Sequence, residues 1–211
     1  VPEGTPIGLL ASVDKAPAGT GLVLNLQNYG PIIIPQGQNS AYIPIGIRSD
    51  DLYTQGSETQ SNLIISHSGG GYDSLSYGPP VSVAVVDDQD PTIVRLSHVE
   101  PQIEDGSSVS YTLSVNHAPQ GSDLVLVVTV NGVEQQVTIK ENATESEPFS
   151  VPTRVDDVYV QGETTTNVSV KSWSGGRYEA VDISGAHDSF TTTDDQDPTI
   201  VRLSHVEPQI E

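Results

Sequence analysis

The chain has 211 residues, of which 28 are acidic and 8 are basic, so its formal net charge is -20. This excess of negative charge argues against binding to nucleic acids or to anionic membrane surfaces. Cysteine is absent, so disulfides and thiolate zinc sites are excluded. No window approaches the apolar length of a membrane span, so direct membrane insertion is not expected.

Apolar and polar residues alternate with a period of two in several short runs, a pattern typical of half-buried β-strands. The runs include VSVAV at residues 81–85, VSYTLSV at 109–115 and NVSVKSW at 167–173. Residues 109–115 place four apolar side chains on one face: Val109, Tyr111, Leu113 and Val115. No segment shows a helical stripe, so the chain is expected to be all-β.

A tight hairpin is predicted within residues 128–139, which read VTVNGVEQQVTI. Asn131 and Gly132 lie between two β-rich runs, and this dipeptide favours a two-residue turn because both central residues need positive φ. Short strands separated by glycine and proline are typical of a β-sandwich of immunoglobulin-like topology. The absence of cysteine excludes the disulfide of antibody domains.

The sequence contains two drifted copies of one module. DDQDPTIVRLSHVEPQIE occurs at residues 87–104 and again, unchanged, at 194–211. SVDKAPAGTGLVL, which begins at Ser12, resembles SVNHAPQGSDLVL, which begins at Ser114. RSDDLYTQG and RVDDVYVQG, which begin at Arg48 and Arg154, follow in the same order. We therefore expect two tandem immunoglobulin-like β-sandwich domains arranged end to end.

The repeat boundaries predict three parts. Residues 1–90 form a sandwich repeat that lacks its first strand, residues 91–197 form a second repeat, and residues 198–211 supply the first strand of a following repeat. The chain is thus expected to be a piece of a longer array in which neighbouring repeats contact one another. An unpaired strand edge attracts a matching strand, so head-to-tail self-association of the fragment is also expected.

Chemistry is concentrated in carboxylates. Each DDQD run places three carboxylates among four residues, directly before a proline. One interpretation is a solvated acidic linker. The other is a site for Ca²⁺, which accepts irregular sets of oxygen ligands and offsets the repulsion between them.

Two further acidic groups favour the calcium interpretation. Asp50–Asp51 and Asp156–Asp157 lie in equivalent loops, and Glu3 and Glu104 each precede a small turn. Because loops of a sandwich alternate between its two ends, a turn, a loop and a linker can meet at one end. The sequence therefore predicts a calcium cage there.

The acidic turn, APQG, VPTRVDDVYVQGET, SGGRYEAV and TTTDDQD occur in a fixed order. In this order the chain resembles the extender repeats of giant RTX adhesins of Gram-negative bacteria. The resemblance implies Ca²⁺-dependent immunoglobulin-like sandwiches, related in layout to Calx-beta domains, at the extracellular surface of a bacterium. It also implies that calcium at domain junctions stiffens a tandem array.

Carried onto this sequence, the resemblance implies metal ligands in both copies. In the first copy they are Glu3, Asp50, Asp51, Glu58, Asp87, Asp88 and Asp90. In the second copy they are Glu104, Asp156, Asp157, Glu163, Asp194, Asp195 and Asp197.

The expected function is that of a calcium-stabilised spacer that projects adhesive domains for attachment or biofilm formation. The alternative is an adhesin module that binds a glycan or a protein, for which Trp173 is a candidate stacking platform. An enzyme is not expected, because no serine lies in a glycine-flanked elbow and His67 aligns with Trp173.

Overall fold

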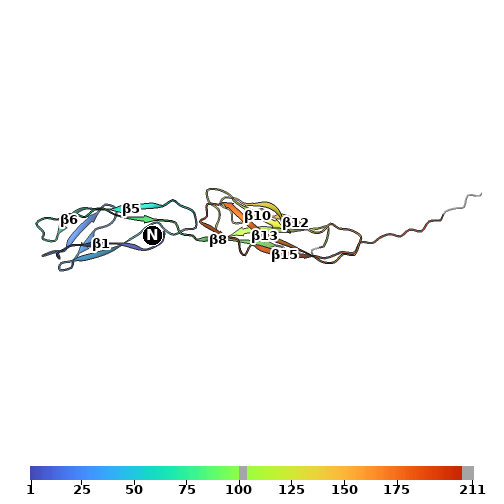
Figure 1. Cartoon of the computed structure of the whole chain (residues 1–211), viewed down its shortest axis with the longest axis horizontal. Coiled ribbons are helices and arrows are strands. Elements are labelled where there is room, and N and C mark those ends of the chain that lie inside the picture. Colours follow the sequence, from blue (N-terminus) through green and yellow to red (C-terminus); the bar gives the residue numbers. More distant parts are fainter. Residues whose placement is uncertain (100–103, 206–211) are drawn as a thin grey trace, which may run out of the picture. The chain divides into compact units, whose positions relative to one another are not determined.

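The computed structural model describes residues 1–99 and 104–205. The chain divides into two compact units, Val1–Asp90 (unit 1) and Pro91–Glu211 (unit 2). Strands joined by turns and loops build both units, so the chain is all-β (Figure 1). Among the described residues, no helix is long and apolar enough to span a membrane.

Unit 2 contains two four-stranded sheets. One has the order β11-β10-β13-β15, with β10 at Leu124–Val130, β11 at Val133–Ile139, β13 at Thr164–Gly175 and β15 at His187–Thr192. The other has the order β12-β9-β8-β14, with β8 at Pro91–His98, β9 at Ser108–Val115, β12 at Phe149–Pro152 and β14 at Ala180–Asp182.

The core of unit 2 lies between these sheets. The period-two prediction for β9 is confirmed, because its alternate apolar side chains are buried: Val109, Tyr111, Leu113 and Val115. On the other sheet, Leu124, Leu126 and Val128 of β10 are also buried. The rings of Tyr111 and Phe190 lie 6.3 Å apart, which joins β9 to β15. This arrangement is consistent with a β-sandwich.

The predicted hairpin is confirmed. Strands β10 and β11 pair antiparallel from Val130 and Val133 outward. The two turn residues between them, Asn131 and Gly132, have φ of 48° and 89°. Asparagine and glycine tolerate this left-handed conformation, which a type I′ turn requires.

Unit 1 is built from shorter pieces. Strand β1 (Ile7–Ser12) pairs with β4 (Ser40–Ile45). A three-stranded sheet has the order β3-β2-β6, with β2 at Leu22–Leu26, β3 at Ile32–Ile34 and β6 at Ile64–Gly69. Strand β5 (Glu58–Asn62) pairs with β7 (Val81–Val85). Together β5 and β6 correspond to the single long strand β13.

The segment predicted as the first strand of a following repeat, 198–211, is described only in part. Residues 198–205 form no strand and are exposed, and 206–211 lie outside the described residues.

Candidate metal centre

Backbone hydrogen bonds hold the acidic turn of unit 2 at one end of the unit. The Asp105 N–H donates to the carbonyl oxygen of Thr193 at 3.2 Å, and the Gly106 N–H donates to that of Arg154 at 2.8 Å. The turn is thereby fixed against the loop that follows β12 and the segment that follows β15. These are the turn, the loop and the linker that the sequence predicts to meet at one end.

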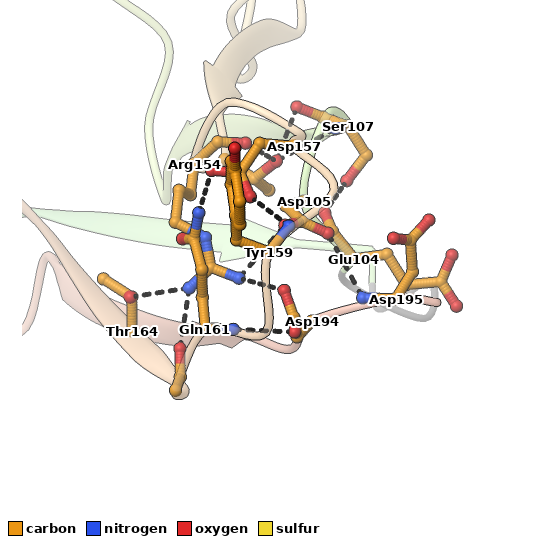
Figure 2. A network of polar contacts seen from close by, with 12 residues as sticks. Glu104, Asp105, Ser107, Arg154, Asp157, Tyr159, Gln161, Thr164, Asp194 and Asp195 are labelled. Atoms are coloured by element: carbon orange, nitrogen blue, oxygen red, sulfur yellow. Dashed lines mark hydrogen bonds and ion pairs between the residues drawn. The ribbon is translucent and has the colours of Figure 1, made fainter. Parts of the chain in front are cut away.

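Arg154 organises this meeting point (Figure 2). Its Nη2 donates to Asp105 Oδ2 at 3.0 Å and to Asp194 Oδ1 at 3.1 Å, and its Nη1 donates to the carbonyl oxygen of Gly162 at 2.6 Å. The Asp105 side chain is only 1% exposed, so its charge is balanced within the protein. Asp194 also accepts from the Gln161 N–H at 2.8 Å. Both of its oxygens are therefore in use.

Asp157 shapes the loop that carries Arg154. Its Oδ1 accepts from the Tyr159 N–H at 2.8 Å, an Asx-type turn, and its Oδ2 accepts from the Gln161 side-chain amide. The carboxylate is thus occupied by bonds within its own loop. The preceding residue, Asp156, is also exposed, and its carboxylate is the one of the pair that lies near Asp105 and Asp195.

Three carboxylates gather beside this framework. Oxygen atoms of Asp105, Asp156 and Asp195 all lie within 4.8 Å of one another. The Asp195 N–H also donates to Asp105 Oδ1 at 3.4 Å. Asp197 interacts with the carboxylate of Asp156, so it lies at the edge of the same cluster.

The carboxylates of the cluster differ in whether a nearby positive charge balances their negative charge. The hydrogen bond from Arg154 lowers the pKa of Asp105. Loss of hydration raises the pKa of Asp195, and the charges of Asp156 and Asp105 raise it further. The charges of Asp156 and Asp195 raise the pKa of Asp197. The negative charges of Asp195 and Asp197 are therefore destabilised by lost hydration and by the neighbouring carboxylates. A bound cation would offset this repulsion.

Unit 1 repeats the framework. The Glu3 N–H donates to the carbonyl oxygen of Val86 and the Gly4 N–H to that of Arg48, both at 3.0 Å. The Arg48 guanidinium pairs with Glu3 and with Asp87, and the Glu3 side chain is fully buried. Asp51 accepts from the Tyr53 N–H at 2.7 Å, as Asp157 accepts from Tyr159.

Unit 1 also repeats the cluster. Oxygen atoms of Asp50, Asp88 and Asp90 lie within 4.8 Å of one another. Loss of hydration raises the pKa of Asp50, and the charges of Asp90 and Asp88 raise it further. One oxygen of Asp88, Oδ1, is buried and accepts no hydrogen bond from any described residue. A buried carboxylate oxygen of this kind needs a partner, and a cation is one.

The donor set selects the class of ligand. In the part of the chain that the structure describes, both clusters offer carboxylate oxygens, which bind hard divalent cations. Their arginines are already paired with Glu3, Asp87, Asp105 and Asp194. The arrangement can therefore hold a cation such as Ca²⁺ beside an internal ion pair.

The residues singled out in the sequence take three different places. Those brought together in the clusters are Asp50, Asp88, Asp90, Asp156 and Asp195, with Asp197 adjacent. Those engaged in the framework are Glu3, Asp51, Asp87, Asp157 and Asp194. Glu104 is exposed beside Asp195, whereas Glu58 and Glu163 lie outside both three-aspartate clusters.

Asp105 and both arginines are not among the residues predicted from the sequence. The sequence pairs Glu3 with Glu104, but the backbone contacts match Glu3 with Asp105, because Glu3 bonds to Val86 as Asp105 bonds to Thr193. The alignment of Ser12 with Ser114 carries the same signal, since the same spacing places Gly4 on Gly106. Because Glu104 and Asp105 are adjacent, the acidic pattern alone did not show which of the two corresponds to Glu3.

Comparison with known proteins relates unit 2 to a protein family. A search of curated proteins found no match. A family model, the LapA domain, matches residues 90–195, which covers half of the chain and all the strands of unit 2 in the described residues. This domain indicates a protein related to cell-surface adhesins. The chain therefore belongs to the LapA domain family.

Proposed function

We propose that this chain is a pair of calcium-stabilised spacer repeats of a bacterial cell-surface adhesin, similar to the extender repeats of giant RTX adhesins. In this proposal the two units are tandem immunoglobulin-like sandwiches outside the cell. Each binds Ca²⁺ at its acidic end, and the bound ions stiffen the array that projects an adhesive domain for attachment or biofilm formation.

The observation that carries the proposal is that one acidic arrangement is built twice. In each unit an arginine pairs with a buried acid of the opening turn and with the first aspartate of DDQD. In unit 1 Asp50, Asp88 and Asp90 form a cluster within 4.8 Å, and in unit 2 the buried acid Asp105 forms one with Asp156 and Asp195. A solvated linker would need neither the buried acid nor the same arrangement in both units, whereas a cation site depends on both.

Calcium fits the clusters better than magnesium does. Ca²⁺ accepts six to eight oxygen ligands in flexible geometry, whereas Mg²⁺ demands a near-ideal octahedron. Asp50, Asp88 and Asp90 come from a loop and from the irregular segment after β7, so their oxygens form an irregular set of ligands. Water and backbone carbonyls can complete the shell.

A spacer role is favoured over a glycan-binding role by where the two copies differ. DDQD and the segment after it are identical in both copies, whereas the rest has drifted. The candidate stacking residue, Trp173, is half-buried in β13 opposite Leu126. Its ring is therefore not presented as an open platform.

Small-angle X-ray scattering tests the spacer role on the full chain. Calcium-stripped protein is expected to have a smaller or more variable maximum dimension than protein in millimolar calcium. The variant Asp88→Asn/Asp90→Asn is expected to resemble the stripped protein in either buffer.

The matched control is Asp73→Asn/Glu147→Gln, which removes the same charge from exposed positions. It is expected to respond to calcium as the wild type does. If calcium raises the melting temperature but leaves the scattering profile unchanged, the metal sites stand and the stiffening role is wrong.

A further inference from the structure

Strands β8 and β15 are the first and the last strand of unit 2 in the described residues. In the proposed array, neighbouring repeats pull on unit 2 through the chain at both of its ends. Tension then enters at Pro91, where β8 begins, and leaves through the DDQD segment that follows β15. These two strands therefore receive the tension before any other part of unit 2.

The first and last strands belong to different sheets. Strand β8 lies in the sheet β12-β9-β8-β14, and β15 is the edge strand of the sheet β11-β10-β13-β15. Backbone bridges join the sheets on the opposite side of the unit, where Ile139 meets Ser146 and Ser114 meets Glu145. In the part of the chain that the structure describes, no ladder pairs β8 with β15. Contact between these two strands therefore depends on their side chains.

One side-chain bond joins the two strands directly. His98 is the last residue of β8, and its Nδ1 bonds to Oδ2 of Asp188 on β15. An ionised carboxylate only accepts hydrogen bonds, so the Nδ1–H of His98 is the donor. The side chains of His98 and Asp188 are 12% and 28% exposed, so the bond is largely shielded from water.

The surroundings of the bond hold both partners in place. Asp188 Oδ1 accepts from the Ser189 N–H at 2.8 Å, which fixes the carboxylate. His98 faces Tyr111 across the β8–β9 ladder, with ring centres 5.2 Å apart. Tyr111 is completely buried, and burial and the charge of Asp188 raise its pKa. The bond thus lies against the packed core and does not depend on mobile surface side chains.

The direction of the strands shows how tension acts on this bond. The chain continues from β8 to Glu104 and from β15 to Thr193, and these two residues form a parallel bridge. Both strands therefore run toward the acidic end of unit 2. Tension pulls β8 back toward Pro91 and pulls β15 forward toward the acidic end. The two strands are thus drawn in opposite directions, and the bond between them opposes this sliding.

We propose that the His98–Asp188 bond ties the first and last strands of unit 2 together and slows the unfolding of this unit under tension. This role rests on the proposed spacer function, because it matters only in a chain that is pulled from both ends. Neither residue belongs to an aspartate cluster of the described residues, so the tie does not require calcium.

Unit 1 provides an internal comparison. Alignment of the two DDQD runs places Val81 at the position of Asp188. The valine side chain accepts no hydrogen bond, so unit 1 cannot form this tie. The unfolding of unit 1 should therefore not respond to changes at His98 or Asp188.

Single-molecule force spectroscopy in calcium-free buffer tests the tie on the full chain. The chain has no cysteine, so Val1→Cys and Glu211→Cys provide unique attachment points. Two unfolding events are expected, and that of unit 2 releases more chain because unit 2 is longer. Asp188→Asn is expected to raise the unfolding rate of unit 2 at a given force about fivefold, the factor that corresponds to one lost hydrogen bond. The event of unit 1 should not change.

A second variant and a matched control identify the bond itself. His98→Gln should raise the unfolding rate of unit 2 as Asp188→Asn does, and the double variant should unfold no faster than either single variant, because both changes remove one interaction. His187→Gln is the control, since the His187 ring bonds to the carbonyl oxygen of Ser184 in its own loop. This control should unfold at the wild-type rate.

A second pulling direction separates the tie from a general contribution to stability. Gln120→Cys and Val133→Cys are exposed positions on either side of β10, so tension applied there bypasses β8 and β15. Asp188→Asn should have little effect in this direction. An equal rise in the unfolding rate in both directions would overturn the proposal, as would an unchanged rate when the chain is pulled from its ends. If calcium leaves the wild-type rate unchanged while Asp188→Asn still raises it, the calcium role is wrong and the tie stands.

Discussion

A Cβ atom placed on Gly106 would lie 2.8 Å from the Cβ of Asp156, closer than real Cβ contacts allow. Gly106 also has a φ of 67°, which side chains other than glycine rarely adopt. The turn glycine therefore makes room for one of the clustered aspartates. Unit 1 shows the same relationship, because a Cβ on Gly4 would lie 2.6 Å from the Cβ of Asp50.

Gly106→Ala is expected to destabilise unit 2 and to weaken calcium binding there. A left-handed alanine costs about 1–3 kcal/mol. For a domain of this size each kcal/mol lowers the melting temperature by about 4–8 °C. The contact with Asp156 must also relax, which moves that carboxylate. Thermal melts with and without calcium measure both effects.

Gly132→Ala is the control for this variant. Gly132 has a φ of 89°, but a Cβ there meets no atom within 4 Å. It should lower the melting temperature through backbone strain and leave the calcium response unchanged. A calcium response equally reduced in both variants would contradict the role assigned to Asp156.

Arg154→Gln is expected to lower the stability of unit 2 markedly. Asp105 is almost completely buried and would lose the charge that balances it. The pKa of Asp105 is lowered by this arginine, so its contribution to stability is present above the unfolded-state pKa. The contribution is lost as the pH falls through the folded-state pKa.

The measurement is the melting temperature of both proteins between pH 2 and pH 7, and the difference should shrink toward the acid end. Lys140→Gln is the matched control, since Lys140 forms an exposed ion pair with Asp123. Exposed pairs contribute little, so this variant should change the melting temperature slightly. A pH-independent difference for Arg154→Gln would contradict the ion-pair account.

Asp195→Asn is expected to act in opposite directions with and without calcium. Loss of hydration and the charges of Asp156 and Asp105 raise the pKa of Asp195 in the folded state. A carboxylate with a raised pKa contributes stability below its unfolded-state pKa and loses it as the pH rises through the folded-state pKa.

In calcium-stripped buffer at pH 7 the Asp195→Asn variant should therefore melt above the wild type. Below about pH 4 this advantage should disappear, because Asp195 is then protonated in both states. In millimolar calcium the order should reverse, because the variant has lost a ligand. An unchanged order in the two buffers at pH 7 would show that Asp195 does not bind the ion.

The strands were predictable because their signal is local. The alternation over Val109 to Val115 and the turn at Asn131-Gly132 each depend on a few neighbouring residues, and both are confirmed. The sequence also indicated that three acidic segments meet at one end of each unit. That inference needs only the number of loops between the strands, because the loops of a sandwich alternate between its two ends.

It was not predictable in the same way which acids form internal hydrogen bonds and ion pairs and which lie in the clusters. Asp157 looks like a ligand in sequence, but its carboxylate is occupied by Tyr159 and Gln161 of its own loop. Asp194 likewise pairs with Arg154, which is distant in sequence. Such assignments depend on which side chains fill the space between loops, and a single sequence does not encode that pairing in a local pattern.

Calorimetric titration of the calcium-stripped chain with CaCl₂ tests the central claim, that each unit holds Ca²⁺ in its aspartate cluster. The account predicts saturable binding to both units, with dissociation constants of about 10⁻⁴ to 10⁻³ M. At free calcium near 100 times the dissociation constant, binding adds about 2.7 kcal/mol to the free energy of unfolding. Asp50→Asn should remove the binding of unit 1 and Asp156→Asn that of unit 2, each leaving the other intact. Absence of saturable heat in the wild type, or a titration that neither substitution changes, would contradict the claim.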